Sequence, residues 1–159
     1  MAWNTNMPLI PQGTSRIDHG DGVCGPYTAA LLSDTGGLTQ FGAFIETLPP
    51  GSASSTLHWH AQEDEMVHIL TGTVTLIEGD MQTPMHPGDT ACFQAGIPVG
   101  HCLRNDSDAP ASYMVIGTRS GRDDVTYPLT GDTLTIREGI KTYRDADGTI
   151  THTAPYHGA

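Results

Sequence analysis

Hydrophobic and polar residues alternate over short stretches of this chain, and Gly, Pro, Asn or Asp residues separate one stretch from the next. A period of two places successive side chains on opposite faces of a strand, so each stretch predicts a half-buried β-strand. Strands are expected over residues 27–32, 38–48, 54–60, 65–70, 73–78, 81–85, 90–93, 101–105 and 111–117. No stretch predicts a helix. Many short strands joined by Gly- and Pro-containing turns predict an all-β fold, either an antiparallel barrel or a sandwich.

The length of 159 residues corresponds to one domain with extensions. Residues 1–35 begin with many Pro, Gly, Asn and Asp residues and predict an N-terminal arm. Its hydrophobic side chains require burial, and a second subunit could provide it. The strand pattern assigns residues 36–118 to the barrel. Residues 119–159 are more polar and less periodic, so we expect an irregular C-terminal extension that wraps the barrel, with weak strands at 133–136 and 140–143.

Potential metal ligands are concentrated in residues 51–72, GSASSTLHWHAQEDEMVHILTG. In a strand, His58 and His60 project from one face and the intervening tryptophan projects from the other. A short polar turn after His60 would start a returning strand at Glu65, which places a carboxylate beside the two imidazoles. This combination predicts a site for a first-row transition metal.

A second stretch, GDTACFQAGIPVGHCLRN, could supply a third imidazole from His101. Glu63 and Asp64 are alternative carboxylates within the first stretch. Glu63 follows His60 too closely for a turn to be completed, and Asp64 fits only a shorter turn. We therefore expect the metal ligands to be His58, His60, Glu65 and His101.

These two stretches resemble the paired sequence motifs of the cupin superfamily. The first motif is a glycine, five residues, His-x-His, three or four residues, a glutamate, six residues and a glycine, and residues 51–72 fit it with one extra residue near the start. The second motif is a glycine, five residues, Pro-x-Gly, two residues, a histidine, three residues and an asparagine. In this chain Gln94 replaces the proline, and four residues separate Gly96 from His101. The spacing from His101 to Asn105 is kept.

The resemblance implies a small, single-domain bacterial cupin with a double-stranded β-helix, or jelly-roll, barrel. It assigns metal binding to the same three histidines and glutamate. It also implies a homodimer, which is common among small cupins. In the family, the loop that corresponds to residues 94–100 lies near the barrel mouth, so its longer form is expected to alter the pocket. The resemblance implies no particular reaction, because cupins have many functions.

The composition excludes several classes of function. The 18 acidic and 7 basic residues give a formal net charge of −11 at pH 7, which makes the chain a poor partner for nucleic acids and for anionic membrane surfaces. This charge also disfavours highly phosphorylated ligands unless a metal or a nearby arginine offsets it. No hydrophobic stretch has membrane-spanning length, and the first residues do not resemble a signal peptide, so we expect a cytoplasmic protein. The three cysteines lack metal-binding spacing and are expected to be reduced.

The sequence contains no phosphate-binding loop, dinucleotide-binding glycine pattern or serine-nucleophile elbow. Three imidazoles and one carboxylate suit one divalent Fe, Mn, Ni, Co or Zn ion per chain. The expected ligand is a small oxygen-rich molecule that chelates this ion, and the expected activity is that of a dioxygenase, an isomerase or a lyase. The alternative is a non-catalytic protein that binds or senses a small ligand.

No catalytic residue is assigned by the motifs. Glu46 and Tyr113 are the candidates for proton transfer, because they belong to the predicted strands that would line the pocket. The full set of pocket candidates by strand position is Gln40, Phe44, Glu46, Phe93, Tyr113 and Met114.

Overall fold

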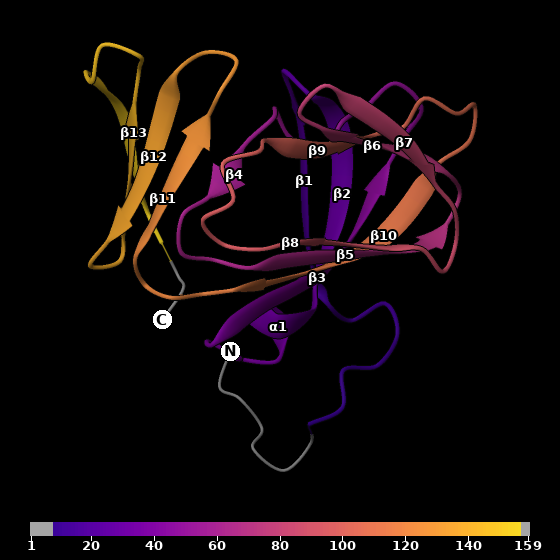
Figure 1. Cartoon of the computed structure of the whole chain (residues 1–159). Helices are drawn as coiled ribbons and strands as arrows, with labels where there is room; N and C mark the ends of the chain where they lie inside the picture. Colours follow the sequence, from indigo (N-terminus) through magenta and orange to yellow (C-terminus); the bar gives the residue numbers. More distant parts are fainter. Residues whose placement is uncertain (1–7, 157–159) are drawn as a thin grey trace.

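The computed structural model describes residues 8–156, and nearly every element in that range is a β-strand (Figure 1). The largest sheet has the strand order β1-β2-β3-β10-β5-β8. Its strands are β1 (Arg16–Gly22), β2 (Gly25–Leu31), β3 (Phe41–Leu48), β10 (Ala111–Thr118), β5 (Glu65–Thr71) and β8 (Thr90–Phe93). A smaller sheet with the order β7-β6-β9 consists of β7 (Met81–Met85), β6 (Val74–Glu78) and β9 (His101–Arg104). The all-β prediction is therefore confirmed.

These two sheets enclose the hydrophobic core of the barrel (Figure 1). The alternation within β10 shows why, because Ala111, Tyr113 and Val115 are buried whereas the residues between them are only half buried. The smaller sheet contributes Val74, and its Leu103 is also buried. Packing of the inward-facing hydrophobic side chains from both sheets supplies most of the driving force for barrel formation.

The turn at the end of the first motif requires glycine at position 72. Gly72 has φ +73°, and a Cβ atom at this position would lie 2.6 Å from the carbonyl oxygen of Pro110 and 2.7 Å from Cα of Ala111. A side chain would therefore meet backbone atoms that cannot move without displacing β10. Close packing against β10 therefore explains the glycine at this motif position, without any contact to a ligand.

A third sheet forms most of the C-terminal segment, with the strand order β14-β13-β12-β11-β4. Its strands are β14 (Ile150–Pro155), β13 (Ile140–Arg144), β12 (Asp132–Arg137), β11 (Asp123–Tyr127) and the two-residue β4 (Trp59–His60). The expectation of an irregular extension was wrong for this segment, although the weak strands at 133–136 and 140–143 lie within β12 and β13. The regular structure arises because β11 pairs with β4, so that an ordered edge beside the barrel extends into an antiparallel meander (Figure 1).

The predicted strand over residues 54–60 is reduced to the two residues of β4. The hydroxyl-rich segment before β4 instead forms isolated contacts, in which the Ser54 N–H group donates to the Leu103 carbonyl and the Ser54 hydroxyl accepts from the Leu103 N–H group. Side-chain hydroxyls that bind backbone groups compete with a regular ladder.

The predicted N-terminal arm, residues 1–35, contains a β1–β2 hairpin at the edge of the large sheet, and β2 covers most of the strand predicted over residues 27–32. The short helix α1 (Leu32–Thr35) then leads to β3. Residues 1–7 of the arm lie outside the described residues, and contact of the arm with a second subunit stays a prediction. Within the described range, no helix is long and apolar enough to cross a membrane.

Candidate metal centre

The structure brings together the four residues that the sequence predicted as metal ligands. His58 precedes β4, His60 ends it, and Glu65 starts β5. A nitrogen of each of these two histidines and a carboxylate oxygen of Glu65 lie within 4.8 Å of one another. The imidazole rings of His58 and His60 have a centroid separation of 5.1 Å. Their role as metal ligands stays a prediction.

His101 reaches the same cluster from the first position of β9. Its backbone pairs with that of His58, because the N–H group of His101 donates to the His58 carbonyl oxygen at 2.9 Å. The two ring centroids lie 4.9 Å apart. His101 Nε2 lies 3.5 Å from Glu65 Oε1, yet this buried nitrogen has no hydrogen-bond partner within residues 8–156. Phe93 stacks against the His101 ring at 3.6 Å and fixes its plane.

Hydrogen bonds at Nδ1 determine the tautomers of the other two histidines. His58 Nδ1 lies 3.0 Å from the carbonyl oxygen of Thr56, and His60 Nδ1 lies 2.6 Å from Oδ2 of Asp123. A carbonyl and a carboxylate only accept hydrogen bonds, so these two contacts favour the tautomers in which Nδ1 carries the proton. The Ser55 hydroxyl, 3.1 Å from His58 Nδ1, can accept from the same N–H group. Nε2 of each neutral imidazole is then a free acceptor, as metal binding requires.

Burial and the surrounding charges oppose each other at these groups. Burial lowers the pKa of His58, so this imidazole is neutral at pH 7. Burial also acts to lower the pKa of His60, but the hydrogen bond to Asp123 outweighs it and the pKa is raised. For Glu65, burial acts to raise the pKa, whereas His101 and the neighbouring imidazoles lower it below its ordinary value. The centre therefore contains an ionised carboxylate beside imidazoles that bind protons with different affinities.

Asp123 is a functional residue that the sequence interpretation missed. It is the first residue of β11 and is completely buried. Its carboxylate accepts hydrogen bonds from His60 and from the N–H group of Gln62 at 2.9 Å. These bonds lower the pKa of Asp123 although burial acts to raise it, so Asp123 is an anion that holds His60 in place.

Glu63, which had been rejected as a ligand in favour of Glu65, lies on the other side of His60. It is buried, and an oxygen of its carboxylate is within 4.8 Å of His60 and Asp123 ligand atoms. Its Oε1 atom accepts hydrogen bonds from the N–H group of Ser120 at 3.0 Å and from the hydroxyl of Tyr156 at 3.1 Å. The C-terminal segment thus orients two carboxylates around His60.

A cavity of about 170 Å³, the barrel cavity, opens beside the cluster. His58, Glu65 and His101 line it together with hydrophobic side chains of the core. Four of the six pocket candidates also line it, namely Phe44, Glu46, Phe93 and Tyr113. The prediction was wrong for Gln40, which is exposed, and for Met114, which has the opposite strand parity to Tyr113.

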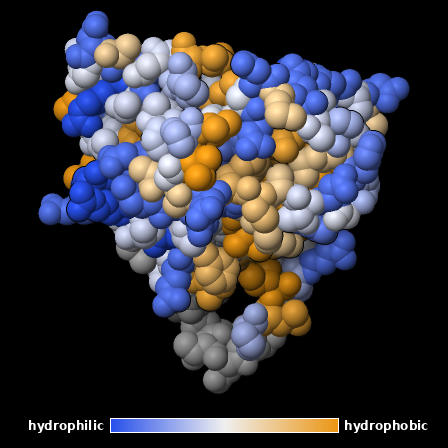
Figure 2. Space-filling view, in the orientation of Figure 1, coloured by the Kyte–Doolittle hydropathy of each residue, from blue (hydrophilic) through white to orange (hydrophobic). Residues whose placement is uncertain are grey.

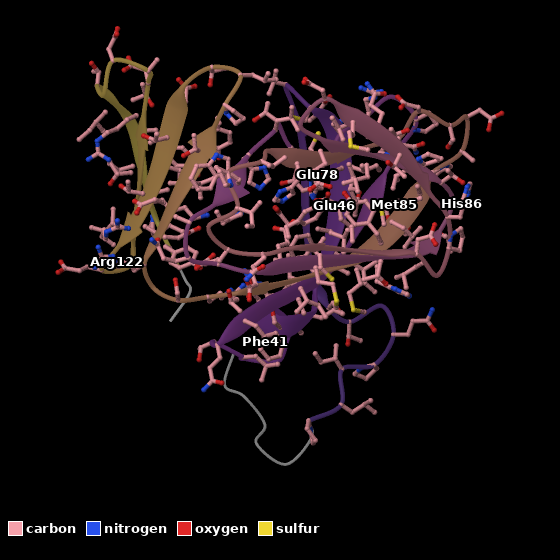
Figure 3. All side chains as sticks on the ribbon, in the orientation of Figure 1. Phe41, Glu46, Glu78, Met85, His86 and Arg122 are labelled. Atoms are coloured by element: carbon pink, nitrogen blue, oxygen red, sulfur yellow. The ribbon has the colours of Figure 1, made fainter. Side chains whose placement is uncertain are left out.

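Glu46 and Tyr113 form a buried pair in this cavity. They are directly opposite each other on β3 and β10, and the Tyr113 hydroxyl donates a short hydrogen bond to Oε1 of Glu46. Burial raises the pKa of Glu46 to about 6, although the hydrogen bond from Tyr113 lowers it. Burial and the nearby Glu46 raise the pKa of Tyr113 far above its ordinary value, so the phenol remains protonated. Figure 3 shows Glu46 in the middle of the barrel.

The loop that departs from the family motif lines a second cavity of about 250 Å³, the loop cavity. The loop residues Gln94, Ile97 and Val99 form one wall. Gly96 adopts φ +81°, and its N–H group donates to the His60 carbonyl oxygen at 2.9 Å. The longer loop therefore shapes a pocket beside the histidines, as expected from its length. Trp59, the tryptophan between the two histidines, also lines this cavity.

The donor set fits a divalent first-row metal ion. Two imidazoles have Nε2 free, the third has a buried and unpartnered Nε2, and the carboxylate beside them is ionised. A buried polar atom without a partner is rare in proteins, and a metal ion would satisfy this nitrogen of His101. Imidazole nitrogens and one carboxylate are common ligands of Fe, Mn, Ni, Co and Zn.

Comparison with known proteins identifies the family. The sequence model of the family described as "Cupin domain" matches residues 44–117. A sugar phosphate isomerase of the cupin superfamily from Silicibacter pomeroyi is 36% identical to this chain, with 77% of this chain and 78% of that protein covered and a TM-score of 0.74. The chain belongs to the cupin superfamily. The fold predicted from the paired motifs, a double-stranded β-helix barrel, is therefore confirmed.

Two further structures resemble this cupin. A putative sugar phosphate isomerase from Acidithiobacillus ferrooxidans is 26% identical over 92% of this chain and 97% of its own, with a TM-score of 0.82. A predicted oxalate decarboxylase from Thermotoga maritima is 19% identical over 69% of this chain and 97% of its own, with a TM-score of 0.60, and so shares the fold. The comparison with curated proteins finds no match.

Proposed function

We propose that this cupin is a metal-dependent isomerase that moves a proton between adjacent carbon atoms of a small hydroxy-carbonyl compound. The observation that carries the proposal is the Glu46–Tyr113 pair, which faces the same cavity as His58, Glu65 and His101. The motif region had provided no second acid or base beside the metal ligands. Glu46 supplies one from β3, and its environment tunes it for proton transfer.

His58, His60, Glu65 and His101 would hold the metal ion. A divalent ion bound there acts as a Lewis acid toward the oxygen atoms of a chelating ligand. Asp123 and Thr56 keep the Nδ1 atoms of His60 and His58 protonated, which directs Nε2 of both rings to the ion. The barrel cavity, at about 170 Å³, is smaller than the roughly 300–1,000 Å³ of drug-sized pockets and suits a compact ligand.

Glu46 would act as the general base. A base with a pKa near the working pH is ionised in a useful fraction of molecules and still binds a proton well. Glu46, with a pKa of about 6, meets this condition whereas an ordinary carboxylate does not. It would take the proton from the carbon beside the carbonyl and return it to the neighbouring carbon, while the hydroxyl proton passes from one oxygen of the substrate to the other. Tyr113 stays protonated and would hold the Glu46 carboxylate in one orientation.

The relatives favour an isomerase over the other two activities expected from the sequence. The relatives from Silicibacter pomeroyi and Acidithiobacillus ferrooxidans are described as sugar phosphate isomerases, the second one putatively. An aldose–ketose conversion requires a base that serves two adjacent carbons, and Glu46 matches that requirement because it lines the barrel cavity and is not an expected metal ligand. If the protein were instead a dioxygenase, the iron-loaded protein should consume oxygen. Oxygen uptake is therefore measured together with the test described below.

The test is proton exchange into a small hydroxy-carbonyl compound. The metal-loaded protein is incubated with dihydroxyacetone in deuterated water, and deuterium incorporation next to the carbonyl is followed by NMR. Glu46→Gln should reduce exchange by about 10²- to 10⁴-fold. In the wild type, kcat/KM should rise with pH through about 6, because only the ionised carboxylate accepts the proton.

Tyr113→Phe provides the matched variant, since it retains Glu46 and removes the hydrogen bond that lowers its pKa. The midpoint of the pH profile should therefore move to higher pH in this variant. Undiminished exchange in Glu46→Gln, with its metal content intact, would contradict the assignment of Glu46. Ligand binding without exchange in the wild type would instead support the non-catalytic alternative.

We also infer that the protein is a homodimer. One row of side chains crosses four strands on the face of the large sheet opposite the cavity, and its members are Ile17, Ala30, Ile45 and Met114. Figure 2 shows further hydrophobic residues gathered at the lower end of the molecule, where Phe41 lies beside α1 in Figure 3. Leu38 and Phe41 are both exposed. Hydrophobic surface of this extent is typical of an interface.

A further inference from the structure

The loop cavity has a different chemistry from the barrel cavity. The two cavities share His101 and Phe93, so they adjoin at the metal centre. The barrel cavity is lined mainly by hydrophobic core residues, whereas the loop cavity is lined by Trp59 together with the carboxylates of Glu63 and Glu78. His101, with its buried and unpartnered Nε2, belongs to the wall of both.

No lysine or arginine is among the described residues that line either cavity. Arg122, which immediately precedes β11, is well separated from Glu46 and Glu78 in Figure 3. A phosphate monoester carries a charge of about −1.5 to −2 at pH 7 and is usually bound by arginine, lysine or a helix N-terminus. Two carboxylates in the same cavity would repel such a group, and the net charge of −11 adds to this repulsion.

The same residues suit the hydroxyl groups of an uncharged sugar. Glu63 is buried, and the contacts from Ser120 and Tyr156 all reach its Oε1 atom. A carboxylate accepts hydrogen bonds through both oxygens, so Oε2 can accept from a ligand hydroxyl without disturbing these contacts. Trp59 adds a large hydrophobic surface to the cavity that can contact the C–H groups of a sugar ring or chain.

We propose that the loop cavity is a subsite for the hydroxyl-bearing end of an unphosphorylated sugar or polyol, held by Trp59, Glu63 and Glu78. This inference rests on the proposed function, because it places the reacting carbonyl end at the metal centre and in the barrel cavity. The hydroxyl-bearing end then occupies the loop cavity. The substrate therefore differs from that of the sugar phosphate isomerases to which the chain is similar.

The departure of residues 94–100 from the family motif accounts for this subsite. The Ala95 N–H group donates to the Asp64 carboxylate at 2.8 Å, and the Gly79 N–H group donates to the Gly100 carbonyl oxygen at 2.9 Å. Together with the bond from Gly96 to His60, these contacts anchor the longer loop at several points. The loop cavity is consequently a formed pocket with a fixed wall.

The experiment compares matched pairs of ligands by isothermal titration calorimetry. Zinc-loaded protein at pH 7 is titrated with D-fructose and D-fructose 6-phosphate, and with D-ribose and D-ribose 5-phosphate. In at least one pair, the free sugar should bind at least 10-fold more tightly than its phosphate. Trp59→Ala should weaken binding of the free sugar by about 10-fold. Glu78→Gln should reduce the ratio between the affinities for the free sugar and for its phosphate, and Glu78→Lys should reduce this ratio further.

Glu138→Gln is the matched control, because it removes one exposed negative charge from the β12–β13 turn without altering either cavity. Its preference for the free sugar should equal that of the wild type. Tighter binding of both phosphates than of their parent sugars would overturn the subsite, and so would the absence of binding by any of the four compounds. Exchange into dihydroxyacetone tests the isomerase proposal separately, since that compound is too small to need the loop cavity.

Discussion

Replacement of Asp123 by Asn should weaken metal binding although Asp123 is not itself an expected ligand. Asp123 lies 63 residues from His60 in the sequence, and its carboxylate fixes the tautomer of that histidine at a distance of 2.6 Å. Asparagine has almost the same shape, so the substitution changes hydrogen bonding with little change in packing. Its amide oxygen can still accept from Gln62, but its NH₂ group would then face the Nδ1–H group of His60. Two donors cannot bond, so His60 would lose its partner or shift its proton to Nε2.

The contacts of Asp123 set the magnitude of this effect. The side chain is 0% exposed, so water cannot replace the lost acceptor. A hydrogen bond to a charged group contributes about 1.5–3 kcal/mol. Loss of a residue that orients a metal-bound histidine typically costs about 10- to 100-fold in affinity, or roughly 1.4–2.7 kcal/mol. The two estimates agree, and we expect the dissociation constant for zinc to rise by about 10- to 100-fold.

Zinc affinity is measured by calorimetry or chelator competition over a range of pH. The pH dependence separates competition from protons at His60 from the loss of its orienting partner. Asp124→Asn is the control, because Asp124 is adjacent on β11 and its carboxylate pairs with Arg137 at the surface. That exposed pair should contribute at most about 1 kcal/mol to stability and nothing to metal affinity. Equal zinc affinity in Asp123→Asn and the wild type would refute the argument.

Two other predictions concern metal content and assembly. His58→Ala should retain the fold and lose most of its metal by elemental analysis, and acidification should release metal from the wild type because imidazole must be neutral to coordinate. Metal content equal to that of the wild type would place the site elsewhere. Light scattering at micromolar concentration should give the mass of two chains, and Met114→Lys, within the hydrophobic row of the large sheet, should shift the protein toward monomers. A monomer mass in the wild type would contradict the dimer.

The sequence predicted the ligand cluster because its geometry is mostly local. His58 and His60 share one face of an extended segment, and Glu65 follows after a short turn, so the short stretch of chain keeps all three close. The expected return strand does not pair with β4, because β4 pairs with β11 whereas β5 lies in the large sheet. The spacing also selected Glu65 over Glu63, which the structure places on the other side of His60 beside Asp123. Only His101 depended on a distant pairing, and the resemblance to the paired motifs supplied it.

The residues around the cluster depended on pairings that the sequence does not reveal. Glu46 and Tyr113 were named only by strand position, because inward parity follows from register between β3 and β10. The strand β11 begins with two aspartates, Asp123 and Asp124, and two polar residues in a row do not show the alternation that predicts a strand. Pairing of that strand with β4 turns Asp123 toward His60. Tertiary context therefore decided the structure where the local pattern was weak.

The dependence of the metal centre on the C-terminal sheet can be tested without metal. If Asp123 acts through His60, the effects of His60→Ala and Asp123→Asn on the free energy of unfolding should not be additive. His60→Ala leaves the buried Asp123 carboxylate without its imidazole partner, and Asp123→Asn leaves Nδ1 of His60 without its acceptor. The double variant has neither the imidazole nor the carboxylate. Urea denaturation of the metal-free proteins should therefore give a coupling energy of about 1–3 kcal/mol. The Asp124→Asn substitution should be additive with His60→Ala. Additivity in both cycles would mean that Asp123 stabilises β11 alone, and the weaker zinc affinity of Asp123→Asn would then require another cause.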